Sequence, residues 1–407
     1  MKRNNVRPTA GESRTHAPGL ATLAATGPHP PSSGPINPSV ERASTILYPT
    51  VENYMNRHDG FYDDVIYGLY GTGTTFALAE SVAALEGGYM SVITSSGSAA
   101  ITLAMISFLK AGDHALVADC VYGSTRKFCE QTLRPLGVEV SYFDPLADTE
   151  AFTAAFRPNT QLVYFEAPGS QTFELSDLPK LAAIARARGA VTLMDNTWAT
   201  PIFFRPVEHG IDVSIASATK YLSGHSDVML GTATMATTEH YERVKDTVGR
   251  WGNCAGPDEC YLVHRGIRTL DVRLERHQRN AMRLIEWLQR QPLVKRVLYP
   301  ALRSDPGYPL WSRDFKGASG LFGVVLDERC RAVAASFFDH LQRFKMGSSW
   351  GGFESLAVPA WPPPERLHRP APADGYLIRV HAGLEDPADL LADLADGFHR
   401  LQAALAQ

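Results

Sequence analysis

Short apolar runs alternate with segments of helical periodicity through the first half of this chain, and this alternation most constrains its fold. The apolar runs predict strands at 90–94, 115–118, 138–143, 162–166, 191–195 and 213–216. Apolar residues spaced every three to four positions predict amphipathic helices at 76–86, 99–109, 124–136 and 178–188. Such alternation is typical of an α/β fold with a mostly parallel sheet that carries helices on both faces.

The alternating units occupy residues 76–260, and two further parts are predicted before and after them. Residues 1–75 are expected to form an extended N-terminal arm, with the first 35 or so mobile, because Pro, Gly, Ser and Thr dominate its beginning. Residues 261–407 are expected to form a smaller C-terminal α/β domain. A long helical region at 258–291 leads into it, with strands at 294–299, 321–326 and 377–381 and helices at 332–341 and 387–404.

Composition and charge restrict the partners that such a fold would have. The 407 residues carry a formal net charge of -4 without a basic run, so we expect neither nucleic acid nor a membrane as partner. The cysteines are odd in number and lack Cys-x-x-Cys spacing, which favours reduced thiols. No stretch approaches the roughly 18 apolar residues of a membrane span. We expect a cytoplasmic protein whose partners are small molecules and its own copies.

Lys220 lies in an environment unlike that of a surface lysine. Seven uncharged residues precede it, beginning with an apolar strand, and no acidic residue lies within six positions. A lysine held away from water can be neutral and nucleophilic, as imine formation with an aldehyde requires. The cofactor chemistry that uses such a lysine is that of pyridoxal 5'-phosphate, so Lys220 is predicted as its Schiff-base residue.

Three other strand-end loops offer the further groups that this cofactor needs. Asp195 ends a predicted strand, where a carboxylate can keep the pyridine nitrogen protonated, although capping a turn would explain it equally well. Gly97 and Ser98 precede a predicted helix, whose N–H groups and dipole favour a phosphate. Tyr122 can stack on the ring, although lone tyrosines are more often structural. These positions coincide with the edge at which parallel sheets bind ligands.

Four stretches of this chain resemble a known family: 217–221 (SATKY), 224–227 (GHSD), 67–72 (YGLYGT) and 85–88 (LEGG). They identify it as a member of the Cys/Met-metabolism family of pyridoxal-phosphate enzymes, within the fold-type I, aminotransferase-like superfamily. The resemblance extends over about residues 35–400. Trp350, in the stretch 348–355, resembles the cystathionine β-lyase branch, because γ-synthases and γ-lyases usually carry leucine there.

The resemblance also implies roles for individual residues. Arg379 matches the arginine that holds the substrate α-carboxylate, and its planar guanidinium at a strand end suits bidentate binding. Ser217 and Thr219 resemble phosphate-binding hydroxyls beside the lysine, with Gly97 and Ser98 as phosphate-binding amides. Ser349 and Trp350 belong to the stretch that would contact the substrate.

Tyr67 resembles a tyrosine that such enzymes lend to the phosphate of a neighbouring subunit, which requires at least a dimer. The resemblance leads us to expect a homotetramer, a dimer of dimers with shared sites, although the sequence does not fix dimer or tetramer. Many relatives carry an arginine two residues later, where this chain has Leu69. Either a nearby cation, Arg57 or His58, replaces that arginine, or hydroxyls and amides alone hold the phosphate. We expect weaker cofactor retention than in a relative with the arginine.

Together these features predict a carbon–sulfur lyase that converts L-cystathionine into homocysteine, pyruvate and ammonia by β-elimination, a step in methionine synthesis. Lys220 and Tyr122 are the predicted catalytic residues, with Lys220 as base and then acid. Three alternatives stay open: γ-elimination or γ-replacement, a broader cysteine-S-conjugate β-lyase, and a non-catalytic regulatory protein with the same fold. No metal site is predicted, and His225 and Asp227 are assigned a structural role.

Overall fold

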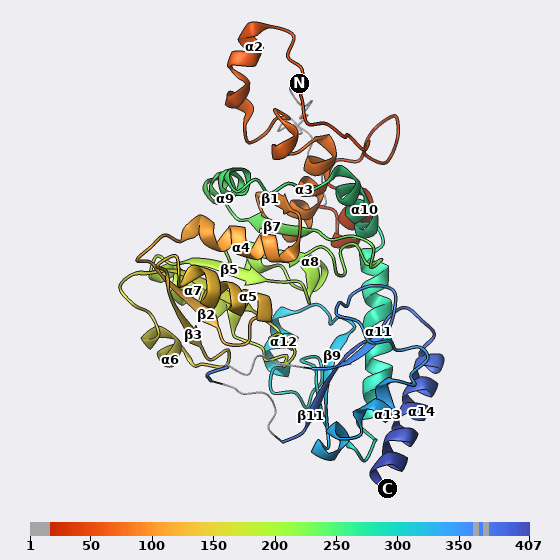
Figure 1. The fold of residues 1–407 in the computed structure, drawn as a ribbon. Coiled ribbons are helices and arrows are strands. Elements are labelled where there is room, and N and C mark those ends of the chain that lie inside the picture. The colour runs from red at the N-terminus through yellow and green to blue at the C-terminus, as the bar shows by residue number, and fades with distance from the viewer. Residues whose placement is uncertain (1–16, 361–365, 369–373) are drawn as a thin grey trace.

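A seven-stranded sheet forms the centre of the molecule (Figure 1). The computed structural model describes residues 17–360, 366–368 and 374–407. The strands lie in the order β1 (Met90–Thr94), β7 (Gly231–Met235), β6 (Val213–Ser217), β5 (Val191–Asp195), β4 (Thr160–Glu166), β2 (His114–Ala118) and β3 (Glu139–Phe143). Every residue of β2 and β7 is buried. Because successive strand residues point to opposite faces, both faces of these strands are covered.

The sheet is mostly parallel, as the sequence predicts. All neighbouring pairs from β6 to β3 are parallel, whereas β7 pairs antiparallel with both β1 and β6. Strand β7 was not predicted from the sequence pattern. Its sequence GTATM contains small residues and threonines instead of an apolar run, and its burial comes from insertion between two other strands.

A second sheet, with four antiparallel strands, lies toward the C-terminus (Figure 1). Its order is β10 (Leu356–Pro359), β11 (Tyr376–His381), β9 (Leu321–Leu326) and β8 (Val294–Leu298). Three of these strands were predicted; β10, with only four residues, was not. The long helices α11 (Leu270–Leu288) and α14 (Pro387–Leu405) lie beside this sheet and contact each other.

Six of the other helices coincide with predicted helical segments, with shifted boundaries: α3 (Gly73–Glu86), α4 (Gly97–Phe108), α5 (Gly123–Phe128), α7 (Leu178–Ala187), α10 (Pro257–Ile267) and α13 (Ala334–Phe338). Six were not predicted: α1 (Leu20–Thr26), α2 (Val51–Met55), α6 (Thr149–Ala154), α8 (Thr200–Phe203), α9 (Thr238–Arg250) and α12 (Tyr308–Asp314). The helix predicted at 124–136 is divided between α5 and a π-helical turn, Cys129–Leu133.

The helical region predicted at 258–291 is broken between α10 and α11. Arg273 lies in α11 with its side chain buried, and it donates hydrogen bonds to the carbonyls of Gly266 (2.7 Å) and Tyr221 (2.8 Å). A carbonyl at the end of α10 therefore has a side-chain donor in place of the next helical turn. This donor lies seven positions later in the chain, and the Tyr221 carbonyl that also holds it lies 52 positions earlier than Arg273, so helical periodicity alone does not reveal the break.

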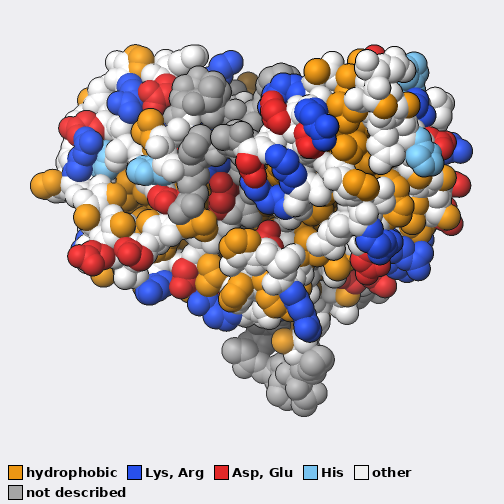
Figure 2. Space-filling view, turned by 90° about the horizontal axis from the view of Figure 1, so that it is seen from below, with side chains coloured by type: hydrophobic (Ala, Val, Ile, Leu, Met, Phe, Trp, Pro, Cys, Tyr) orange, Lys and Arg blue, Asp and Glu red, His pale blue; other side chains and the backbone are white. Residues whose placement is uncertain are grey.

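The distribution of charged side chains on the surface agrees with the small formal net charge of the chain. On the face shown in Figure 2, acidic and basic side chains are interspersed, without a broad area of one sign. Helix α2 and the chain beside it project from the top of Figure 1 and carry exposed apolar side chains, among them Leu47, Val51 and Met55. Within the described residues, no helix has both the length and the hydropathy that crossing a bilayer would need.

Candidate active site

A cavity of about 210 Å³ collects nearly all of the predicted site residues. Loops of the seven-stranded sheet contribute Gly97, Ser98, Tyr122, Asp195, Ser217, Thr219 and Lys220, and the C-terminal part contributes Ser348, Trp350 and Arg379. These residues come from segments that are far apart in the sequence. Of the predicted set, Ser349 and Tyr67 do not line the cavity.

The Lys220 amine lies half-buried at the cavity wall. Its Nζ donates a hydrogen bond of 2.6 Å to Ser349 Oγ and lies 5.5 Å from the ring centroid of Trp350. Burial lowers the pKa of Lys220 to about 8, helped by the charge of Arg379 and opposed by Asp195. A substantial fraction of the amine is therefore neutral slightly above neutral pH, as a nucleophilic lysine requires.

The carboxylate of Asp195 both caps a turn and lines the cavity. Its Oδ1 accepts hydrogen bonds from the Thr197 backbone N–H (2.9 Å) and hydroxyl (2.5 Å), and no described residue donates to Oδ2. Burial raises the pKa of Asp195, and the Thr197 bonds and Lys220 oppose that shift. Asp195 can therefore cap the turn with one oxygen and face a pyridine nitrogen with the other. Thr197, which the sequence analysis missed, also accepts from the Ser217 backbone N–H at 2.9 Å.

Glu166 is a second carboxyl group that the sequence analysis missed. It lies opposite Asp195 in the parallel register of β4 and β5, and its Oε2 accepts from the Tyr122 backbone N–H at 2.6 Å. Burial, and then the neighbouring Asp195, raise the pKa of Glu166 well above its usual range. The available signal was that both acids end adjacent predicted strands, which places them at the same sheet edge.

The start of α4 forms a cradle against the end of β6. Ser96 caps this helix by accepting from the Ala99 N–H, whereas the N–H groups of Gly97 and Ser98 have no acceptor among the described residues. A Cβ atom on Gly97 would lie 2.6 Å from Ser217 Cβ, so only glycine allows this approach. Unpaired N–H groups at a helix start bind anions. This arrangement suits the phosphate of a bound cofactor.

The Thr219 hydroxyl is occupied by the backbone of the chain itself. It accepts from the Leu230 N–H at 3.0 Å and donates to the Leu230 carbonyl at 3.2 Å. These bonds hold the lysine loop against the residue that precedes β7. Thr219 therefore positions the loop as well as lining the cavity.

Arg379 lies on β11 and faces the cavity from the C-terminal part. Its Nη2 donates to the carbonyls of Ser349 (3.0 Å) and Gly347 (3.3 Å), and no described residue accepts from its other nitrogens. A guanidinium has five N–H groups, so donors remain for a carboxylate. Burial lowers the pKa of Arg379 somewhat, but the group stays charged at neutral pH.

The aromatic residues divide into those in the cavity and those outside it. Tyr122 lines the cavity and is 46% exposed, and the Trp350 ring packs 5.5 Å from that of Tyr221. Tyr67 is 48% exposed and lies outside the cavity of its own chain. Leu69 lines a different cavity. Neither residue therefore contacts the Lys220 site within one chain.

Comparison with known proteins agrees with this geometry. The family model described as "Cys/Met metabolism PLP-dependent enzyme" matches residues 21–399. The chain is 50% identical to a putative cystathionine β-lyase of Rhizobium johnstonii (90% of this chain, 91% of the relative) and 40% identical to the cystathionine β-lyase of Haemophilus influenzae (91% and 95%). It is also 39% identical to an L-alanine/L-glutamate racemase of Wolbachia pipientis (90% and 93%).

Solved structures show the same fold. The structure of a cystathionine γ-synthase from Xanthomonas oryzae pv. oryzae, in complex with aminoacrylate and cysteine, matches with a TM-score of 0.84 at 30% identity. The match covers 95% of this chain and 100% of that one. The fold is therefore the predicted fold-type I. The chain belongs to the Cys/Met metabolism family of PLP-dependent enzymes.

Proposed function

We propose that the chain is a cystathionine β-lyase, which converts L-cystathionine and water into homocysteine, pyruvate and ammonia. The observation that carries this proposal is the half-buried Lys220 amine, which lines one cavity together with Asp195 and Arg379. Relatives named cystathionine β-lyase, at 40% and 50% identity over nine-tenths of the chain, support it. Pyridoxal phosphate, when bound, supplies an electron sink for the charge that develops at the substrate α-carbon.

Each residue of the site has a task in this proposal. Arg379 binds the substrate α-carboxylate with the donors that Ser349 and Gly347 leave free. Lys220 takes the proton from the α-carbon and returns a proton later, and its pKa near 8 suits both steps. Ser349 holds the amine in place through its bond of 2.6 Å.

The other residues act on the cofactor. Asp195 keeps the pyridine nitrogen protonated, and Tyr122 stacks on the ring and contributes to catalysis beside Lys220. The Gly97 and Ser98 amides and the Ser217 hydroxyl bind the phosphate, and the Thr219 hydroxyl joins them when its proton turns from the Leu230 carbonyl to the phosphate. Trp350 lines the cavity and packs against the substrate. The presence of tryptophan, where γ-synthases and γ-lyases usually carry leucine, supports the β-lyase assignment over γ-elimination.

The test is product identification with the purified, cofactor-loaded protein. L-cystathionine should give pyruvate and homocysteine, and Lys220→Ala should give neither. Cysteine and cystine, assayed side by side, define the breadth of the lyase. Formation of 2-oxobutyrate instead of pyruvate would reject β-elimination in favour of γ-elimination.

A second candidate function is amino-acid racemisation, which the 39% identical racemase relative favours. A racemase removes the α-proton on one face and returns a proton on the other, and both Lys220 and Tyr122 line the cavity. Incubating L-alanine with the protein and measuring D-alanine tests this activity. A lyase without racemase activity forms pyruvate from cystathionine and leaves L-alanine unchanged.

We also propose that the protein is a cytoplasmic homotetramer, assembled as a dimer of dimers in which each active site is shared between two subunits. In this arrangement, Tyr67 contacts the cofactor phosphate of a neighbouring subunit. Its exposed position outside the cavity of its own chain is compatible with this role. The exposed apolar side chains before α3 support burial against another copy. The proposed units are an arm at 1–75, a cofactor-binding domain at 76–260 and a smaller domain at 261–407.

A further inference from the structure

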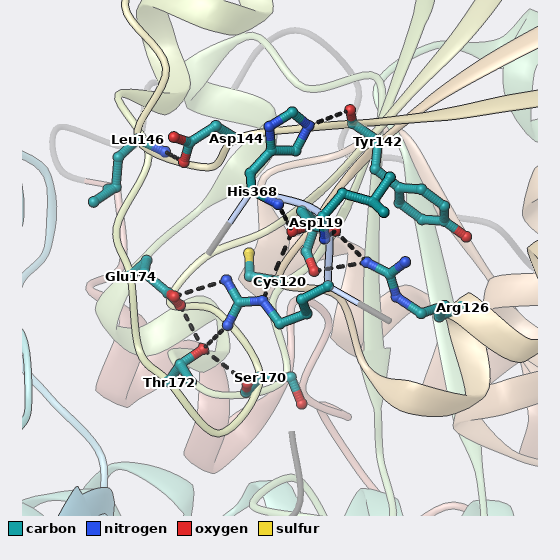
Figure 3. A network of polar contacts seen from close by, with 12 residues as sticks. Asp119, Cys120, Arg126, Tyr142, Asp144, Leu146, Ser170, Thr172, Glu174 and His368 are labelled. Atoms are coloured by element: carbon teal, nitrogen blue, oxygen red, sulfur yellow. Dashed lines mark hydrogen bonds and ion pairs between the residues drawn. The ribbon is translucent and has the colours of Figure 1, made fainter. Parts of the chain in front are cut away.

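A short segment of the connection between β10 and β11 docks onto loops of the seven-stranded sheet (Figure 3). The backbone N–H groups of Leu367 and His368 donate to the carboxylate of Asp119, at 3.1 and 2.9 Å. The ring Nε2 of His368 lies 2.9 Å from the Tyr142 carbonyl oxygen. The segment 366–368 is therefore attached to residues more than 200 positions earlier in the chain.

Arg366 carries the central contacts of this docking. Its Nη1 donates to Thr172 Oγ1 at 2.6 Å, and its Nη2 donates to Glu174 Oε1 at 2.8 Å. Only 1% of its side chain and 13% of that of Glu174 are exposed. Asp119 is fully buried and pairs with Arg126 nearby. Buried charges persist only with good partners, so this balanced set of two arginines and two acids depends on each member.

The loop that Arg366 holds carries unusual backbone conformations. Gln171 and Phe173 have φ angles of 64° and 61°, in the left-handed region that side chains other than glycine disfavour. Thr172, between them, donates to Glu174 Oε2 at 2.6 Å, and the Gly169 N–H donates to the Glu174 carbonyl at 2.8 Å. Such conformations persist where the surroundings impose them, and they are frequent in ligand-binding loops.

This loop also forms part of the active-site wall. Both Gln171 and Phe173 line the cavity that holds Lys220, whereas Arg366 does not. Arg366 instead holds Thr172 and Glu174, the residues beside Phe173 in the chain. Arg366 therefore affects the shape of the cavity through these two residues, although it does not itself line the cavity.

We propose that Arg366 is a positioning residue for substrate binding: it holds the 169–174 loop so that Gln171 and Phe173 form the wall against which the substrate side chain packs. The inference rests on the proposed function only for the choice of a thioether amino acid as substrate. Small displacements of a binding wall weaken binding strongly, because contacts and orientation are lost together.

The test compares Arg366→Gln, Glu174→Gln and their double variant with an exposed control, Arg331→Gln, which breaks a surface ion pair with Glu328. We expect each single variant to raise the KM for cystathionine about tenfold, with kcat changed less than about threefold. The double variant should raise KM no more than either single one, because both lose the same contact. The cofactor absorbance should be unchanged, and the control should match wild type.

A second measurement keeps the result independent of turnover. L-methionine is a thioether amino acid without a β leaving group, and its dissociation constant can be read from its effect on the cofactor absorbance. Arg366→Gln should raise this constant in parallel with KM. If wild type cleaves no thioether, the proposed function fails, and the L-methionine constants still decide the role of Arg366.

The outcomes divide clearly. Unchanged KM and unchanged L-methionine affinity in a less heat-stable Arg366→Gln variant would overturn the inference, since the network would then serve stability alone. A lower kcat at constant KM would overturn it as well. Should Arg366→Gln not fold, Thr172→Val removes one hydroxyl and no charge; a KM raised about threefold supports the inference, and a wild-type KM overturns it.

Discussion

Gly97→Ala tests whether the start of α4 forms the phosphate cradle. The added Cβ would lie 2.6 Å from both Cβ and Oγ of Ser217 and 3.0 Å from its Cα. Carbon atoms in contact normally keep about 3.5–4 Å, so helix and strand must separate by about 1 Å. The N–H groups of Gly97 and Ser98 move with the helix, away from the hydroxyl of Ser217.

This displacement gives a predicted loss of cofactor affinity. A hydrogen bond to a charged group contributes about 1.5–3 kcal/mol, so losing one to the phosphate weakens binding roughly 10- to 150-fold. The overpacking itself costs about 1–3 kcal/mol of stability, and the lower chain entropy of alanine in the unfolded state offsets about 0.4–1 kcal/mol of that. Cofactor affinity should therefore change more than stability.

The assay is equilibrium titration of the cofactor-free protein with pyridoxal phosphate, followed by absorbance. Gly123→Ala is the matched control, because Gly123 also begins a helix and a Cβ there would meet no atom within 4 Å. If Gly97→Ala binds the cofactor within about threefold of Gly123→Ala, the cradle assignment is wrong, since the expected loss is at least about tenfold.

Three further predictions concern Lys220 and the missing arginine. Between pH 8 and its ordinary pKa of 10.5, Lys220 is protonated in the unfolded chain but not in the folded one, so stability rises with pH across that window. From pH 7 to pH 10, the cofactor-free protein should gain about 2.5 kcal/mol relative to Lys220→Met, measured by urea unfolding, and equal pH slopes would contradict the low pKa. Ser349→Ala, which removes the bond of 2.6 Å to Lys220, should lower kcat about tenfold with the cofactor still bound; an unchanged kcat would exclude a positioning role. Leu69→Arg should tighten cofactor binding about tenfold in titrations, and equal affinity would mean that the leucine does not weaken cofactor binding.

The sequence correctly predicted that the cofactor-binding residues lie close together, because their positions follow from local patterns. Gly97, Tyr122 and Lys220 each follow a predicted strand, Asp195 ends one, and all four line one cavity. Strands that run parallel bring their carboxyl ends to one edge, so strand-end residues meet without knowledge of the strand order. Their catalytic and binding roles stay predictions until the variants are measured.

Other features depend on contacts that local patterns do not encode. Ser349 bonds to a lysine 129 positions away, and Arg366 bonds to Glu174 across 192 positions. The antiparallel insertion of β7 likewise depends on partners from elsewhere in the chain, and the Arg273 guanidinium near the start of α11 is held by the Tyr221 carbonyl, 52 positions earlier.

The sequence by itself determined the α/β alternation, the lysine loop and the edge at which a ligand would bind, because periodicity and charge spacing act over a few residues. Only the tertiary structure decided which loops form the cavity wall, which acid lies beside Asp195, and which groups hold Lys220. These features depend on the strand order β1-β7-β6-β5-β4-β2-β3 and on the docking of the C-terminal part. Both are set by the packing of distant segments, whose contacts leave no period in the sequence.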